Sequence, residues 1–182
     1  MERRELGKYI VADPKICHGK PTFRGTRIMV GQVLKMVADG KDWETICEEW
    51  DGIVSKKAIA EALLVAAQTL VKYENRRPSW LDDEDCNWLE DESLEWPEVN
   101  SLGQYVVANP RVCHGQVTFR GTRIFVKDAL EMVAEGMDWD KISWEWDGKV
   151  TKAAIAEAIL VAAEALETHE SQLAPEPKMV HV

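Results

Sequence analysis

The side chains best suited to binding chemistry in this chain are two pairs of arginines, each pair flanking a Gly-Thr dipeptide. Arg24 and Arg27 flank the first dipeptide, and Arg120 and Arg123 flank the second. An arginine fork donates two parallel hydrogen bonds to a phosphate or a carboxylate, so a duplicated pair can grip a nucleic-acid backbone. We therefore treat the four arginines, with nearby Lys20, as candidate DNA contacts. The alternative is that they bond to acidic side chains or loop carbonyls within the fold.

Lysines at the expected starts of two helices are the second group of candidate DNA contacts. Lys56 and Lys57 in the first half, and Lys152 in the second, lie where a helix-turn-helix unit offers its recognition helix to the major groove. Glu61 and Glu157 are expected on the exposed face of the same helices, where they would repel phosphate. The competing interpretation is an ordinary solvated helix face.

Two Cys-His dipeptides supply thiol and imidazole groups. Cys17-His18 and Cys113-His114 make a Cys₂His₂ zinc set if the fold brings both loops together, but adjacent residues rarely ligate one ion. The alternative is a buried cysteine beside a surface histidine. The sequence contains no carboxylate pair, nucleophile with a base, phosphate-binding glycine loop or metal-binding helix motif, so we predict no enzyme, no cofactor and no metal.

These residues recur because the chain contains an internal duplication. A shift of 96 residues superposes the segment that begins at Tyr9 on the one that begins at Tyr105, and 39 of 63 aligned pairs are identical. We predict a first repeat over residues 1–75, an acidic tryptophan-containing linker over 76–101, a second repeat over 102–170 and a flexible C-terminal tail over 171–182.

Each repeat is expected to contain a short β-arm followed by three helices. In the first repeat, Tyr9–Val11 and Thr22–Ile28 are β-prone but too short to be stable alone, so we expect each to pair with another strand. Pairing across the two copies is one arrangement that would supply the partner. Helical spacing of apolar residues begins at Val30 and stops at Gly40. Asp42 is the expected N-cap of the second helix.

The third helix of each repeat carries the longest apolar stripe. Ser55 and Thr151 are its expected N-caps in the two repeats. A trihelical unit of this size has a small core, so the stripe either fills that core or also forms a seam between the repeats. Three helices with short connections predict a mainly α protein of two tandem trihelical helix-turn-helix domains, each preceded by a short β-arm.

Acidic charge is concentrated between the repeats. The chain has a formal net charge of −10, and residues 79–101 contain nine carboxylates and no cation. This balance argues against a simple nucleic-acid binder. The same segment contains Trp80, Trp88 and Trp96, which are unusual in a spacer because disordered chain is poor in aromatic residues. It is either a solvated linker or a segment that docks on its own domains or on a partner.

The motif D-P-x-I-C-x-G-K-P-x-F-R-G-T-R-I-x-V, which starts at Asp13 and has a close copy at Asn109, resembles the bacterial and archaeal family catalogued as domain of unknown function 433. Members are similar to VapB-type antitoxins. The resemblance implies a homeodomain-like fold in which the β-structure serves dimerisation, and a gene often placed beside a PIN-like ribonuclease toxin.

These observations favour a cytoplasmic, antitoxin-like protein whose repeats form a covalent pseudo-dimer. Its expected partner is a protein, with a PIN-like ribonuclease toxin as the leading candidate and operator DNA as a second ligand. Trp80, Trp88 and Trp96 are the candidate partner-binding residues. The alternatives are a DNA-binding regulator without a toxin and a non-catalytic scaffold. No segment of the sequence is long and apolar enough to span a membrane.

Overall fold

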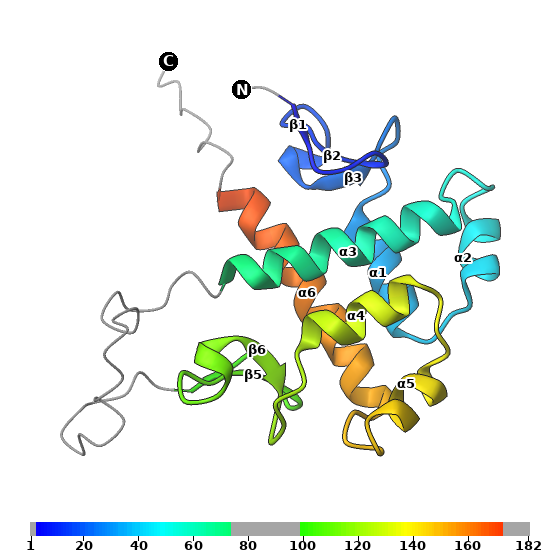
Figure 1. The fold of residues 1–182 in the computed structure, drawn as a ribbon. Helices are drawn as coiled ribbons and strands as arrows, with labels where there is room; N and C mark the ends of the chain where they lie inside the picture. The colour runs from blue at the N-terminus through cyan, green and yellow to red at the C-terminus, as the bar shows by residue number, and fades with distance from the viewer. Residues whose placement is uncertain (1–2, 74–98, 173–182) are drawn as a thin grey trace, which may run out of the picture.

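The computed structural model describes residues 3–73 and 99–172, and within them the two repeats have the same order of elements (Figure 1). The first repeat contains β1 (Arg4–Glu5), β2 (Ile10–Ala12), the 3-10 turn η1 (Cys17–Gly19), β3 (Pro21–Phe23), α1 (Val30–Ala38), α2 (Trp43–Glu49) and α3 (Lys56–Tyr73). The second contains β4 (Asn100–Ser101), β5 (Val106–Ala108), η5 (Cys113–Gly115), β6 (Val117–Phe119), α4 (Val126–Ala134), α5 (Trp139–Glu145) and α6 (Lys152–Gln172). The chain is mainly α and consists of two repeated units, as predicted.

The helix ends follow from capping side chains. The Asp42 carboxylate accepts a hydrogen bond from the Thr45 backbone amide at 2.9 Å, and this cap starts α2. Ser55 and Thr151 cap α3 and α6 by accepting from the amides three residues on, at 3.3 Å and 3.2 Å. The three predicted caps are therefore confirmed. Gly40 ends α1 with a φ of 79°, a left-handed conformation that glycine adopts without strain.

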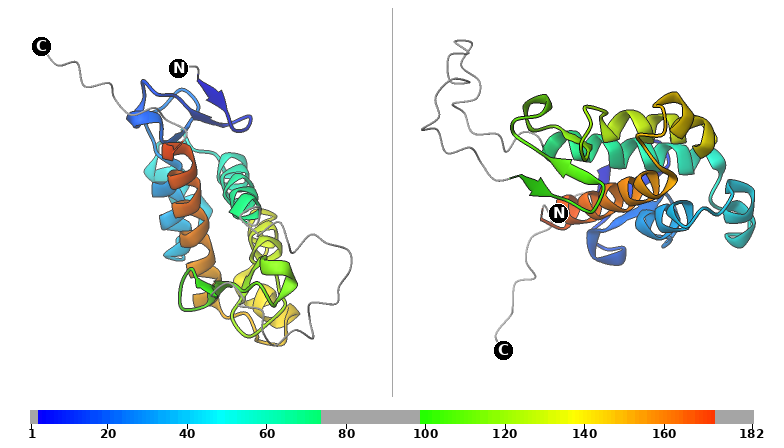
Figure 2. Two further views of the ribbon diagram at one scale, coloured as in Figure 1. Left: turned by 90° about the vertical axis from the view of Figure 1, so that its left-hand side faces the viewer. Right: turned by 90° about the horizontal axis from the view of Figure 1, so that it is seen from below.

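Strand pairing agrees with the expectation only in part. All the strands pair within their own repeat, in two antiparallel three-stranded sheets of order β1-β2-β3 and β4-β5-β6. The expected pairing of each short strand with another is confirmed, but the partners are near in sequence and do not come from the other copy. Arg4–Glu5 adds a third strand to the first arm, and Asn100–Ser101, the last two residues of the predicted linker, adds one to the second. The two sheets lie at opposite ends of the molecule (Figures 1 and 2).

The helices of the two repeats are intertwined. Helix α1 packs mainly against α6 of the other repeat, α4 packs mainly against α3, and α3 and α6 pack on each other. Figure 2 shows the helices of both repeats running alongside one another between the two sheets. The buried side chains of both repeats accordingly form one hydrophobic cluster. The apolar stripe of the third helix is thus a seam between the repeats as well as a core, and each repeat depends on the other to cover it.

Among the described residues, no helix is long and apolar enough to cross a membrane.

Candidate functional site

The first arginine of each pair is bonded within its own β-arm. The Arg24 guanidinium donates to the carbonyls of Lys8 at 2.7 Å and Gly7 at 2.9 Å, and also pairs with Glu5. The Arg24 hydrogen bond holds the pKa of Glu5 below its ordinary value. Arg120 makes the equivalent bonds to two loop carbonyls in the second repeat. Arg24 and Arg120 therefore bond to loop carbonyls within the fold, which was the alternative to a DNA contact.

The second arginine of each pair is placed differently. Arg27 and Arg123 are exposed, and within residues 3–73 and 99–172 no hydrogen bond or ion pair engages either guanidinium. Lys20 instead links the repeats, because its Nζ lies 2.9 Å from the Glu167 carboxylate of α6. The arginines thus remain available to an anionic ligand, whereas Lys20 is held in the seam.

The candidate lysines lie at the start of the third helices, as predicted. Lys56 forms an ion pair with Glu44, and Lys152 lies 2.7 Å from Asp140. The hydrogen bond to Asp140 raises the pKa of Lys152. Lys57 is exposed and, among the described residues, has no ion-pair partner. A phosphate would have to compete with carboxylates for two of these three lysines.

Two glutamates of the third helices serve the fold rather than the surface. The Glu61 carboxylate is half-buried and accepts a hydrogen bond from the Tyr9 backbone amide at 2.8 Å, and Glu157 accepts one from Tyr105 at 2.7 Å. The expectation that both lie on an exposed face is wrong, because each reaches across to the β-arm and satisfies a strand amide. A Cβ built on Gly7 would lie 2.0 Å from Glu61 Oε1, so a larger residue there would force the Glu61 carboxylate to move away from the strand amide.

The two Cys-His turns do not meet. They belong to η1 and η5, which lie beside the two separated sheets (Figure 1). Cys17 Sγ is 3.6 Å from the Arg27 carbonyl, and both Cys17 and His18 have positive φ. Within the described parts of the chain, no three histidine, cysteine, aspartate or glutamate side chains are grouped to hold a metal ion.

Residues of both repeats line a groove in the described part of the chain. It has a volume of about 880 Å³ and is lined by the last turns of α1 and α4, the turns that follow them, and the starts of α2, α3, α5 and α6. Its floor includes the buried Val37 and Val133. Trp43 and Trp139, which are half-buried, line it from α2 and α5. Because equivalent residues of both repeats line the groove, it lies between the repeats and requires both.

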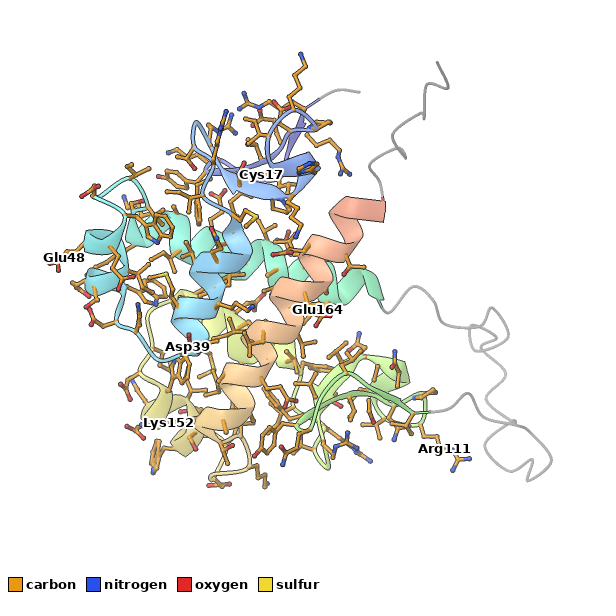
Figure 3. The ribbon with its side chains drawn as sticks, turned by 180° about the vertical axis from the view of Figure 1, so that it is seen from behind. Cys17, Asp39, Glu48, Arg111, Lys152 and Glu164 are labelled. Atoms are coloured by element: carbon orange, nitrogen blue, oxygen red, sulfur yellow. The ribbon has the colours of Figure 1, made fainter. Side chains whose placement is uncertain are left out.

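The lysines of the groove are paired with carboxylates, whereas two of its carboxylates are not engaged by any described residue. Of the described residues, five with carboxylates and three with ammonium groups line the groove. Lys41, like Lys56 and Lys152, is already bonded to a carboxylate, here Glu49 at 2.7 Å. Asp39 and Glu135 occupy equivalent exposed positions, and among the described residues no hydrogen bond or ion pair engages their carboxylates. Figure 3 shows Asp39, at the C-terminal end of α1, and Lys152, at the start of α6, on the same side of the molecule.

Asp39 and Glu135 are also the C-caps of α1 and α4. The C-terminal end of a helix carries a partial negative charge, so a carboxylate is unfavourable there. Such a local conflict, repeated in both copies, is characteristic of a functional surface. Sequence reasoning missed these residues, although the pattern Ala-acid-Gly-x-Asp-Trp, kept at Ala38–Trp43 and Ala134–Trp139, was a usable signal.

The candidate partner-binding residues Trp80, Trp88 and Trp96 lie outside the described residues.

Comparison with known proteins assigns both repeats to one family. The family model described as "Protein of unknown function (DUF433)" matches residues 10–64 and 106–160, which together make up more than half of the chain. The two matches are 96 residues apart, the same shift that superposes the repeats. No curated protein and no solved structure matches the chain.

Proposed function

The chain belongs to the family of proteins of unknown function DUF433, whose domain it carries twice, and we propose that it acts as an antitoxin-like protein. In this proposal the two repeats form a covalent pseudo-dimer whose role is to bind a partner protein, with a PIN-like ribonuclease toxin as the leading candidate. The observation that carries the proposal is the shared core, which makes one body of two repeats and creates a groove that neither repeat has alone.

The distribution of charge supports a protein partner over nucleic acid. Affinity for DNA depends on cations that neutralise phosphates. In the described residues, Arg24 and Arg120 are bonded to their own arms, and Lys56 and Lys152 are paired with carboxylates. The groove between the repeats has an excess of carboxylates. A protein surface with basic and apolar side chains complements it better than a phosphate backbone does.

Co-expression with the PIN-like ribonuclease encoded beside the gene tests the proposal. The expected result is a complex of the two proteins that survives size-exclusion chromatography, and growth that is restored in cells where the ribonuclease alone causes arrest. A matched control is the chain with Leu63→Ala, which weakens the shared core. If the two proteins elute separately and growth stays arrested, the antitoxin-like role is excluded for that partner.

Operator DNA is the second candidate ligand. It is favoured by Arg27, Arg123 and Lys57, which are exposed and whose side chains no described residue engages. This candidate requires that α2 and α3 act as a homeodomain-like helix-turn-helix, with Lys56 and Lys57 at the start of the recognition helix. Replacing both lysines by alanine should flatten the salt dependence of binding to the DNA upstream of the gene. Unchanged affinity and slope would remove the third helix from the DNA contact.

A further inference from the structure

We infer that the groove between α2 and α5 binds a segment of a partner protein in which lysine or arginine alternates with aliphatic residues. The inference rests on the proposed function, because it names the chemistry by which the pseudo-dimer recognises its partner. It concerns the groove lined by Val37, Asp39, Trp43, Val133, Glu135 and Trp139. The six residues form three equivalent pairs, and each pair has one residue in each repeat.

The size and lining of the groove suit a side-chain-bearing segment. A volume of about 880 Å³ lies within the range of clefts that bind ligands. The lining of the groove includes the apolar residues Val37 and Val133, which are each 2% exposed, and Met137. The half-buried indoles of Trp43 and Trp139 provide faces that attract a cation and cover an aliphatic stem.

The charge of the groove selects a cation over an anion. Lys41, Lys56 and Lys152 are each satisfied by a carboxylate. Asp39 and Glu135 remain without a partner among the described residues, at helix ends that are themselves negative. A lysine or arginine side chain bound beside either residue neutralises that carboxylate and the helix end that carries it. A phosphate in the same place meets the repulsion of both.

Small differences between the repeats give the bound segment a direction. Lys41 in the first repeat corresponds to Met137 in the second, and both line the groove. On α6 the groove includes the exposed Ala153, where α3 has Lys57. The second-repeat end is therefore more apolar, so the aliphatic residues of the segment lie toward it. One segment binds per chain, since the groove lies between the two repeats.

A titration with a synthetic peptide of alternating lysine and leucine tests the groove in the full chain. The readout is the indole N–H signals of Trp43 and Trp139 in nuclear magnetic resonance spectra, with the exposed Trp144 as an internal reference. The Asp39→Asn/Glu135→Gln variant should bind the peptide about tenfold more weakly, which corresponds to about 1.4 kcal/mol. Binding should saturate at one peptide per chain.

The matched control variant is Asp128→Asn/Glu145→Gln. It removes the same charge from exposed positions on α4 and α5 that do not line the groove. It also retains the acidic residues 79–101, so any attraction of the peptide to that segment is the same in both variants. Its affinity should change by less than about twofold, because the removed charges are screened by salt.

Three results would overturn the inference. The first is equal affinity of the two variants for the peptide, and the second is a response at Trp144 without one at Trp43 and Trp139. The third is preferential binding of a DNA duplex at Trp43 and Trp139, strengthened by the Asp39→Asn/Glu135→Gln change, which would assign the groove to nucleic acid. Equal capture of the ribonuclease by both variants would reject the groove as its site while leaving the antitoxin-like role intact. Peptide binding in the groove without ribonuclease capture would exclude the antitoxin-like role for that ribonuclease and keep the groove as a binding site.

Discussion

Replacing Leu63 by alanine should destabilise both repeats at once. Leu63 lies in α3 and is 1% exposed, and α3 packs against α4 and α6 of the other repeat. Removing a fully buried leucine side chain costs about 3 kcal/mol, through lost transfer energy and the cavity left behind. With an unfolding slope of about 2 kcal/mol per molar urea, the midpoint should fall by about 1.5 M. The neighbouring Leu64 is 38% exposed, so Leu64→Ala should cost less than about half as much.

The assay is urea unfolding followed by circular dichroism and by tryptophan fluorescence, together with hydrogen exchange measured by mass spectrometry. Because the core is shared, the two optical transitions should coincide. Amide protection should fall by a similar free energy in α3 and in α4, although α4 belongs to the unaltered repeat. Loss of protection in α1–α3 with unchanged protection in α4–α6 would refute the shared core and show that the repeats fold independently.

Three further substitutions test particular contacts. Gly7→Ala places a Cβ 2.0 Å from Glu61 Oε1, so thermal denaturation should show that the free energy of unfolding falls by about 1–3 kcal/mol, because the hydrogen bond to the strand amide is broken. In a Glu61→Ala background the same change should cost less than about 0.5 kcal/mol. An equal cost in both backgrounds would contradict the clash. The hydrogen bonds from the Thr45 hydroxyl and amide lower the pKa of Asp42, so its charge stabilises the fold above the ordinary pKa of aspartate, and this contribution is lost as the pH falls through the lowered value. The melting temperature of wild type should therefore fall more steeply toward acid pH than that of Asp42→Asn, and parallel curves would count against a charged cap. Lys20→Gln should cost about 0.5 kcal/mol at low salt and nothing measurable at high salt, because the Lys20–Glu167 pair is partly exposed; a salt-independent loss would point to packing.

The local elements of this protein could be read from its sequence because each depends on near neighbours. The apolar spacing from Val30 and the stop at Gly40 predicted α1, since one helical period and one left-handed residue suffice to define it. The capping roles of Asp42, Ser55 and Thr151 follow from hydrogen bonds that span only three residues. The duplication needed no structure at all, because it is a property of the sequence.

The candidate site was predictable only in part. The two pairs of arginines were found by type and spacing. Nothing local distinguishes Arg24, which bonds to carbonyls of its own arm, from Arg27, whose guanidinium no described residue engages. Glu61 was expected at the surface, because its partner amide at Tyr9 is 52 residues away. Trp43 was recognised as an apolar residue of α2, but its place in a groove depends on the other repeat.

The sequence by itself determined that there are two copies of one unit, where their helices begin and end, and which face of each helix is apolar. Only the tertiary structure decided what covers those faces: α1 packs on α6, α4 packs on α3, and the two third helices pack on each other. The physical reason is that helical spacing of apolar residues shows which face must be buried but does not specify what packs against it, because apolar contact is not directional. The choice between packing within a repeat and packing across the repeats rests on the summed fit of the whole core. From that choice comes the groove, with two carboxylates that no described residue engages.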